Sequence, residues 1–340
     1  MADSSVPNVA VESEQSVVLN PASPPAAEIS RLFYLILGIA TCIFLIVFVP
    51  LLWLIFRFRA PRDHDGTEPP QIYGSNPIEI AWTVGPAIVV FVLFLVTARS
   101  VFQIKEPATG QSQDLNVRVI GHQWWWEFEY PEYGFTTANE LHVPYTPAHT
   151  PSRADDLAPH VHLDLGSADV LHSFWVPQLS GKTDLVPGRL NTLWFEPKRS
   201  GWFYGQCAEY CGTQHAHMLL RVKAQTEDDF KKWVADQQRP AQDPSEDDTE
   251  ALAGKAIFLT NACANCHTIR GTHAKGIFGP DLTHLMSRTW IAAGIRVNNK
   301  ENLLAWVADP QKIKEGCRMP DMKLTEDEVK KVVAYLMILQ

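Results

Sequence analysis

Basic residues are fewer than acidic ones in this sequence, and no block of lysine or arginine occurs in it. The 340 residues include 38 acidic and 29 basic side chains, which gives a net charge of −9 at pH 7. This balance argues against nucleic acid as a partner and favours a basic protein. The composition also excludes collagen, a coiled coil and a wholly disordered chain. No internal repeat is visible, and the length allows two or three domains.

Charge is absent from two long apolar runs. Leu32–Phe56 and Ile80–Ala98 contain no charged residue, and each is long enough to cross about 30 Å of hydrocarbon. Two such runs close together predict two transmembrane helices rather than buried helices of a soluble domain. Pro50 and Pro86 are expected to kink them.

The first 30 residues contain no lysine or arginine. A cleaved signal peptide needs a basic start, so we interpret residues 1–30 as a flexible tail. The loop between the two apolar runs carries Arg57, Arg59 and Arg62. By the positive-inside rule this loop is cytoplasmic, which places both termini and everything after Val101 outside.

Short alternating runs replace the long ones between about residues 112 and 224. Pro, Gly and Asp clusters separate them, which is typical of a β-sandwich or barrel. The runs are Leu115–Val119, His160–Leu165, Leu190–Phe195 and Met218–Val222. A short helix over Glu227–Gln238 and a Pro-rich acidic tether are predicted to follow.

The remaining stretch has helical periodicity. The predicted helices are Glu250–Asn261, Lys300–Ala308 and Glu326–Leu339, the last introduced by a threonine N-cap with an acid three residues on. The predicted domains are a flexible tail (1–30), a transmembrane helical hairpin (31–105), an all-β domain (106–225), a short helix with an acidic linker (226–249) and an all-α domain (250–340).

A CxxCH motif occurs in the all-α domain. Cys263 and Cys266 lie one helical turn apart and could form thioethers with haem vinyl groups, while His267 becomes the iron ligand. A disulfide and a zinc half-site are the alternatives. Met319, on a loop before the last helix, is the candidate sixth ligand, and Met322 is its competitor. Cys317 and Cys42 have no assigned role.

A second cysteine pair carries a soft ligand set. Cys207, Cys211, His215 and Met218 lie on one loop after a strand, and this set suits copper. Two thiolates allow both sulfurs to bridge two copper ions, and His172 is the choice for the second imidazole. The alternative is a zinc site, which would not use Met218. We expect His142, His149, His160 and His162 to face solvent, and His217 to be no ligand.

The all-α stretch resembles a class I cytochrome c over its whole length. That resemblance implies that Pro280 supplies the carbonyl that orients His267. Gly254, Phe258 and Tyr335 resemble the crossing of the first and last helices of that family.

From the first transmembrane helix onward, the chain closely resembles subunit II of the haem-copper oxidases, in the caa-type group with a fused cytochrome c. The motifs that carry the likeness are Gly121–Tyr130, His172–Pro177, Gly181–Arg189 and the Cys207–Met218 loop. The resemblance implies a membrane-anchored multidomain chain with a cupredoxin-like Greek-key barrel. It also implies a binuclear CuA centre held by His172, Cys207, the Glu209 carbonyl, Cys211, His215 and Met218.

Three further roles follow from this resemblance alone. The Glu209 side chain would help to bind magnesium at the interface with subunit I. Trp124 resembles the family's aromatic through which electrons arrive, although a cytochrome on the same chain competes with a separate donor for that role. Glu79 resembles the carboxylate at the mouth of a proton channel, and a solvated interfacial residue is the alternative.

The predicted function is therefore that of an electron-input subunit in a bacterial cytoplasmic membrane. An external donor, such as a cytochrome c or an upstream respiratory complex, would reduce haem c, and CuA would pass the electron to haem in subunit I. Subunit III is the other expected partner. Reduction of dioxygen with proton pumping is implied by the resemblance. The alternatives are a CuA-type nitric oxide reductase subunit, a copper-delivery protein and a quinol-oxidising subunit II, which would need no CuA ligands.

Overall fold

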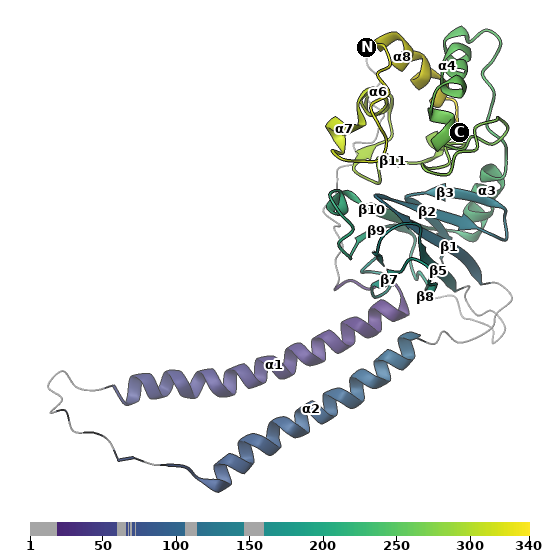
Figure 1. Cartoon of the computed structure of the whole chain (residues 1–340). Helices are drawn as coiled ribbons and strands as arrows, with labels where there is room; N and C mark the ends of the chain where they lie inside the picture. The colour runs from purple at the N-terminus through teal and green to yellow at the C-terminus, as the bar shows by residue number, and fades with distance from the viewer. Residues whose placement is uncertain are drawn as a thin grey trace, which may run out of the picture. The chain divides into compact units, whose positions relative to one another are not determined.

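A computed structural model describes residues 19–59, 66, 68, 70, 71, 73–105, 114–145 and 160–340 of the chain (Figure 1). It forms two compact units, one made of Ala27–Pro107 and the other of the rest. Arg62 and His149, which figured in the predictions above, lie outside the described residues. Each unit is described by itself.

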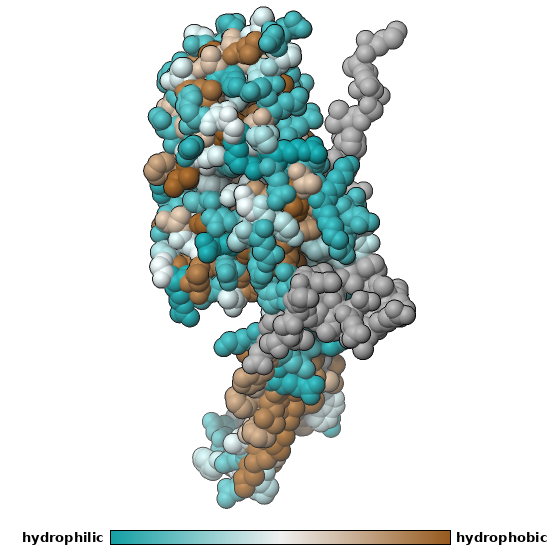
Figure 2. Space-filling view, turned by 90° about the vertical axis from the view of Figure 1, so that its right-hand side faces the viewer, coloured by the Kyte–Doolittle hydropathy of each residue, from teal (hydrophilic) through white to brown (hydrophobic). Residues whose placement is uncertain are grey.

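The first unit is a pair of long helices, α1 (Pro24–Arg57) and α2 (Asn76–Lys105). They contain the two predicted transmembrane runs, and both remain helical through Pro50 and Pro86. Their apolar side chains are exposed on the helix surface (Figure 2), as expected of helices that face lipid or partner helices. The predicted transmembrane hairpin is confirmed as two membrane-capable helices.

The predicted flexible tail is too long. Helix α1 already begins at Pro24, where the fixed φ of proline suits the first turn. Just before it, the backbone N–H of Ala22 donates to the Gln178 carbonyl at 2.7 Å, and Ser23 Oγ accepts from the Glu196 N–H at 3.0 Å. Ala22 and Ser23 are buried. Their small side chains fit against the β domain, which local composition alone does not reveal.

The β domain consists of two five-stranded sheets with the strand orders β3-β2-β1-β5-β8 and β4-β10-β9-β6-β7. Pairs β1–β5 and β4–β10 are parallel, and the other pairs are antiparallel. The first sheet contains β1 (Leu115–His122), β2 (Trp125–Tyr130), β3 (Phe135–Ala138), β5 (Val161–Ser167) and β8 (Asn191–Phe195). The second contains β4 (Glu140–Pro144), β6 (His172–Trp175), β7 (Thr183–Leu185), β9 (Gly201–Cys207) and β10 (Leu219–Gln225). This is the cupredoxin-like architecture that the resemblance implied.

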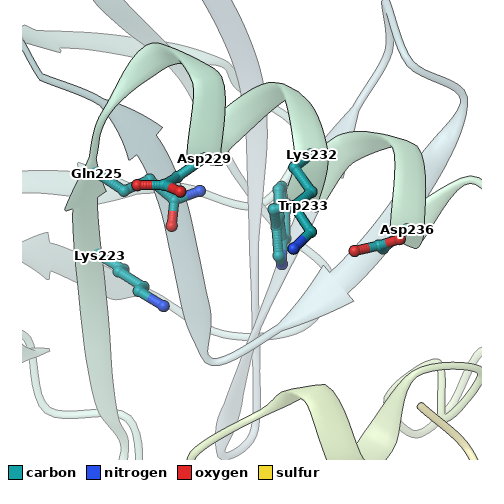
Figure 3. Close-up of a pocket in the computed structure, with 6 residues that line it drawn as sticks. All are labelled: Lys223, Gln225, Asp229, Lys232, Trp233 and Asp236. Atoms are coloured by element: carbon teal, nitrogen blue, oxygen red, sulfur yellow. The ribbon is translucent and has the colours of Figure 1, made fainter.

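Alternating side chains of both sheets form the core of this domain. Trp126, Phe128 and Phe203 are fully buried. Helix α3 (Glu227–Gln237) follows, capped by Thr226. A shallow hollow of about 380 Å³ lies between α3 and β10, with Lys, Asp and Gln side chains and Trp233 around it (Figure 3).

Two histidines of the β domain are not exposed as expected. His142 is 4% exposed and His160 is 8% exposed. The ring of His142 stacks on Trp233, with centroids 4.3 Å apart. Trp233 belongs to helix α3, which therefore covers His142. Nothing in the sequence of the short strand around His142 indicates this contact.

The helical domain contains the three predicted helices and several shorter elements. The elements are α4 (Thr249–Thr260), α5 (Cys263–Cys266), η2 (Leu285–Ser287), β11 (Trp290–Ile291), β12 (Arg296–Val297), α6 (Lys300–Ala308), α7 (Pro310–Ile313) and α8 (Glu326–Leu336). Helix α4 packs on α8, and a Cβ on Gly254 would lie 1.8 Å from the Lys331 carbonyl oxygen. Phe258 and Tyr335 meet edge to face at this crossing, with ring centroids 5.9 Å apart.

The acidic linker is not the free tether that its composition suggested. The Ala241 N–H donates to the Arg270 carbonyl at 3.0 Å, and His284 Nε2 lies 3.0 Å from the Arg239 carbonyl oxygen. Lys255 forms an ion pair with Asp243. The backbone carbonyl and amide groups of the linker thus form hydrogen bonds with the helical domain. The low content of apolar residues in the linker does not predict these contacts.

Candidate metal centre

Three strand ends and one loop bring the sulfur and imidazole side chains together. His172 opens β6, and Cys207 closes β9, whose ladder with β6 pairs Phe174 with Cys207. The loop closes where the Cys207 N–H donates to the Met218 carbonyl at 3.0 Å. A Cβ on Gly121 would lie 2.8 Å from Cδ2 of His172, so strand β1 of the other sheet leaves room only for glycine there.

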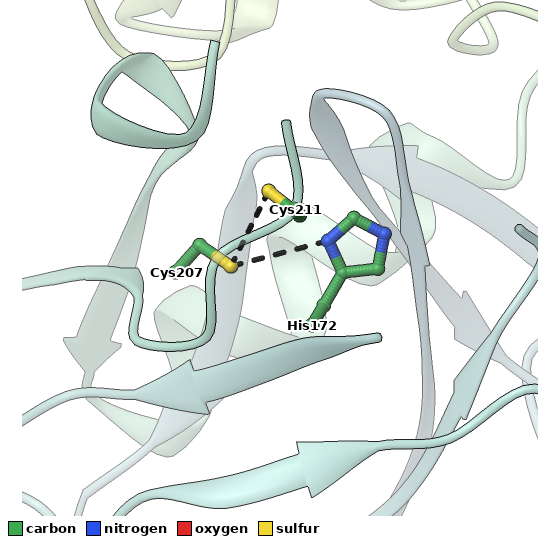
Figure 4. Close-up of side chains that lie close together, drawn as sticks. All are labelled: His172, Cys207 and Cys211. Atoms are coloured by element: carbon green, nitrogen blue, oxygen red, sulfur yellow. Dashed lines mark hydrogen bonds between the residues drawn. The ribbon is translucent and has the colours of Figure 1, made fainter. Parts of the chain in front are cut away.

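The two thiols lie at the centre of this group (Figure 4). Their sulfurs are 3.8 Å apart, far beyond the bond length of about 2.05 Å in a disulfide. Cys207 Sγ is 3.9 Å from His172 Nδ1 and 3.2 Å from the Glu209 carbonyl oxygen. Cys211 Sγ is 3.6 Å from His215 Nδ1 and 3.8 Å from Met218 Sδ. Each of the other four predicted donors therefore lies within 4 Å of one of the two sulfurs.

The protonation states of the Cys207 and Cys211 thiols suit a cation-binding site. A hydrogen bond from Cys211, outweighing the opposing burial, holds the pKa of Cys207 far below its usual range. The same pairing raises the pKa of Cys211, because a second thiolate beside the first is disfavoured. A metal cation removes this repulsion and deprotonates both sulfurs. The donors present thus fit a soft metal.

Asp169 holds the imidazole of His172 in place. Its Oδ1 lies 2.8 Å from His172 Nε2, so Nδ1 is left to face the sulfurs. Burial opposes the charged form of His172, but the hydrogen bonds with Asp169 and Cys207 leave its pKa raised. No motif in the sequence pointed to Asp169, although it lies only three residues before His172.

Trp124 contacts the cysteine loop directly. Its indole N–H donates to the Cys211 carbonyl at 2.9 Å, and Gln123 Nε2 donates to the same oxygen at 2.8 Å. Trp126 is fully buried, and Trp125 stacks on His122 at 4.1 Å between ring centroids. Of the three neighbouring tryptophans, Trp124 is therefore the one whose ring donates a hydrogen bond to the Cys211 carbonyl.

The CxxCH motif forms the short helix α5 with His267 at its end. His267 Nδ1 lies 2.8 Å from the Pro280 carbonyl oxygen. Because a carbonyl only accepts, Nδ1 carries the proton and Nε2 keeps its lone pair. Burial lowers the pKa of His267, which keeps the ring neutral. A Cβ on Gly279 would lie 2.6 Å from the ring.

A cavity of about 780 Å³ opens beside this motif. Side chains from both domains line it, mostly with apolar atoms, and they include Cys263, Cys266, His267, Met319, Met322 and Trp124. Two free thiols, an imidazole and two thioethers around a large apolar space fit an iron porphyrin. Both candidate methionines line the cavity, so Met319 and Met322 remain alternatives.

Buried polar contacts hold the helical domain against the β domain. The Lys314 ammonium donates to the carbonyl oxygens of Trp124 at 2.7 Å and His217 at 2.8 Å. Glu140 Oε1 accepts from the N–H groups of Thr289 and Trp290 at 2.7 and 2.8 Å. Sequence reasoning missed these contacts, because Lys314 and Glu140 belong to no recognisable motif.

Glu79 lies in the first turn of α2, in the other unit. Its side chain is exposed. An exposed position at a helix end also suits a solvated interfacial residue. The role of Glu79 in a proton pathway stays a prediction.

Comparison with known proteins covers nearly the whole sequence. The family models for cytochrome c oxidase subunit II match residues 12–100 with the transmembrane domain and residues 115–225 with the periplasmic domain. The cytochrome c model matches residues 251–340.

Individual relatives agree with these matches. The chain is 34% identical over 328 residues to cytochrome c oxidase subunit 2 of Alkalihalophilus pseudofirmus, covering 95% of this chain and 90% of the relative. It is 34% identical over 299 residues to the subunit 2 of Bacillus sp. strain PS3, covering 83% and 80%. The crystal structure of the periplasmic domain of oxidase subunit II from Bradyrhizobium japonicum is 29% identical and covers 38% of this chain and 97% of that one, with a TM-score of 0.33. The chain belongs to the cytochrome c oxidase subunit II family, with a cytochrome c domain after its periplasmic domain.

Proposed function

We propose that this chain is the electron-input subunit of a haem-copper cytochrome c oxidase. Bound haem c and binuclear CuA would supply one-electron carriers between an external donor and subunit I, where dioxygen is reduced to water with proton translocation. The chain itself supplies the ligands, fixes their orientation and holds the two sites together. It has no oxidase activity alone.

The ligand arrangement supports two copper ions rather than one zinc ion. His172, Cys207 and Cys211 form a group whose donor atoms all lie within 4.8 Å of one another. His215 is not in that group, although its Nδ1 lies 3.6 Å from Cys211 Sγ. A single tetrahedral ion needs all four donors around one point. One imidazole beside each of two shared sulfurs suits a pair of ions, with Met218 and the Glu209 carbonyl as further donors.

The second site supports covalent haem attachment. Cys263 and Cys266 would form the thioethers, and His267 Nε2 would bind iron. The Pro280 carbonyl holds the ring by its Nδ1 proton, which fixes the tautomer needed for ligation. Met319 is our choice for the sixth ligand.

One observation carries the proposed relay. Trp124 lines the cavity at the CxxCH motif, and its indole N–H is bonded to the carbonyl of Cys211. One side chain thus lines the cavity proposed for haem and hydrogen-bonds to the cysteine loop. This supports Trp124 as a connection between them, rather than as a surface for a separate donor.

The remaining assignments extend this proposal. Glu209 would help to bind magnesium at the contact with subunit I, and Glu79 would serve a proton pathway there. Subunits I and III are the membrane partners, and a cytochrome c or an upstream respiratory complex is the donor. Both redox domains would lie on the periplasmic side of a bacterial cytoplasmic membrane, as the arginine-bearing loop indicates.

Optical and EPR spectra of the purified full-length chain test the proposal, together with its metal content. We expect a mixed-valence two-copper signal and a low-spin c-type haem on the same polypeptide. A preparation that holds zinc instead of copper at the cysteine loop would refute the copper assignment. Absence of covalently bound haem after expression with a haem-attachment system would refute the assignment of haem to the CxxCH motif.

A further inference from the structure

Asp114, His160 and His162 form a second group of metal-ligand side chains, which the proposed electron path does not use. One donor atom from each lies within 4.8 Å of the others. Asp114 Oδ2 is 3.2 Å from His162 Nε2, and Asp114 Oδ1 is 3.6 Å from His160 Nδ1. From this geometry we propose that these three residues bind one divalent transition-metal ion of the zinc class.

Strand pairing builds this site. Strands β1 and β5 run parallel with Leu115 opposite Val161, so Asp114 and His160 are neighbours just before the strands begin. Leu115 and Val161 point into the core. Because side chains alternate along a strand, His160 and His162 share the opposite, outer face. The cluster is therefore held by the sheet itself.

An unpartnered nitrogen points into the cluster. His160 is 8% exposed, and its Nδ1 is buried without a hydrogen-bond partner among the described residues. Such an atom costs free energy unless something binds it. The carboxylate oxygen 3.6 Å away is too far for a hydrogen bond. The same oxygen already accepts from the His160 backbone N–H at 3.0 Å, so the Nδ1 atom is the one that lacks a partner, and a cation bound beside it would supply one.

The spacing and chemistry suit zinc. Bond lengths of about 2.0–2.2 Å around a tetrahedral ion place neighbouring ligand atoms roughly 3.3–3.6 Å apart. One donor atom from each of the three residues lies within 4.8 Å of the others, so small side-chain rotations would bring them to that spacing. Two imidazoles and one carboxylate are a borderline donor set that favours zinc and its neighbours over calcium or magnesium. His162 is partly exposed, so solvent can supply the fourth ligand.

This site is separate from the cysteine loop. His172, which lies beside that loop, contacts Gly121, near the far end of β1 from Asp114. Seven residues of strand at about 3.3 Å each put roughly 20 Å between the two ends. The ion would therefore join the beginnings of two parallel strands and act as a structural clamp on the first sheet.

Zinc binding by the copper-loaded, untagged full-length chain tests this inference. Equilibrium dialysis should show one zinc bound per chain beyond the copper. His162→Gln, which removes one of the two imidazole ligands and keeps the Asp114 contact with the His160 backbone N–H, should weaken zinc binding at least about tenfold, since even changes outside the ligand shell cost that much. Zinc should raise the melting temperature of the unmodified chain but not of His162→Gln.

Controls separate a site from general histidine binding and from misfolding. His273→Gln and Asp164→Asn, at exposed positions, should bind zinc like the unmodified chain. The copper EPR signal should be unchanged in His162→Gln, which shows that the domain is folded. Cobalt bound there should give ligand-field bands without thiolate charge transfer. Equal zinc affinity in His162→Gln and the unmodified chain, or no zinc uptake by either, would overturn the proposal.

Discussion

The ammonium of Lys314 lies 2.7 Å from the carbonyl oxygen of Trp124, although 190 positions separate the two residues. Lys314 belongs to the cytochrome domain and is 3% exposed. A buried ammonium needs partners on all sides, and here the β domain supplies two of them. Lys314 therefore positions the cavity at the CxxCH motif against Trp124.

Replacing this lysine should loosen the contact. Lys314→Met keeps the length of the side chain but leaves the carbonyls of Trp124 and His217 unpaired, and each hydrogen bond to a charged group contributes about 1.5–3 kcal/mol. We expect electron equilibration between haem and copper to slow about tenfold or more, with both reduction potentials unchanged. Flash photoreduction of the full chain measures the rate. Lys330→Met, at an exposed ion pair with Glu326, is the control and should behave like the unmodified chain.

The indole N–H of Trp124 offers a second test. Trp124→Phe keeps an aromatic ring and removes the donor to the Cys211 carbonyl. We expect slower haem-to-copper transfer and a small shift in the copper potential, because the carbonyl lies on the ligand loop. The matched variant Trp125→Phe should change neither, since Trp125 also lines the cavity but stacks on His122 and does not donate to the Cys211 carbonyl. Equal effects of the two variants would contradict the assigned role of Trp124.

The two redox sites should respond separately to loss of a ligand. Met218→Leu removes a thioether sulfur 3.8 Å from Cys211 Sγ and should shift the copper potential while haem attachment stays intact. Cys263→Ser should impair haem attachment and leave the copper EPR signal in place. Potentiometric titration and a denaturing gel stained for haem measure the two outcomes. Loss of both signals in either folded variant would show that the sites are not independent.

Gly254 permits the close crossing of α4 and α8. A Cβ there would lie 1.8 Å from the Lys331 carbonyl oxygen, so Gly254→Ala must push the helices apart. Overpacking of this kind costs about 1–3 kcal/mol, and we expect the cytochrome domain to unfold at lower temperature. A shift of the haem absorption band on heating reports it, because the covalently bound haem changes its surroundings when the domain unfolds. Gly38→Ala, where a Cβ meets nothing within 4 Å, should leave that temperature unchanged.

His142 should make the β domain sensitive to acid. Burial lowers its pKa below the ordinary 6.5, and Glu140 only partly opposes this. Below about pH 6.5 the unfolded chain therefore binds a proton that the folded chain does not, and stability falls as the pH falls through this window. His142→Phe keeps the stacking on Trp233 and removes the titration.

Urea unfolding at several pH values measures this effect. The free energy of unfolding of His142→Phe should depend less on pH below about 6.5 than that of the unmodified chain. His273→Gln, at an exposed site, provides the comparison. An identical slope for the unmodified chain and His142→Phe would disprove the explanation.

Features encoded by local spacing could be predicted from the sequence. Uncharged runs around Pro50 and Pro86 revealed the two long helices, and the spacing of Cys207, Cys211 and His215 anticipated a cluster that the structure brings together. Features that depend on distant partners could not. Ala22 packs beside Gln178, and α3 covers His142, and neither contact leaves a trace in the nearby sequence. Lys314 was missed for the same reason.

The hydrogen-bonded linker changes how the cytochrome domain can work. An electron carrier on a flexible linker reaches its acceptor by diffusion, and its transfer rate depends on the length of the linker. Here the linker is hydrogen-bonded to the cytochrome domain at Arg270, and that domain is attached to the β domain by Lys314, so lengthening the linker should have little effect on the transfer rate. The two domains would then behave as one rigid body. The rate of electron transfer between them would not depend on viscosity or ionic strength.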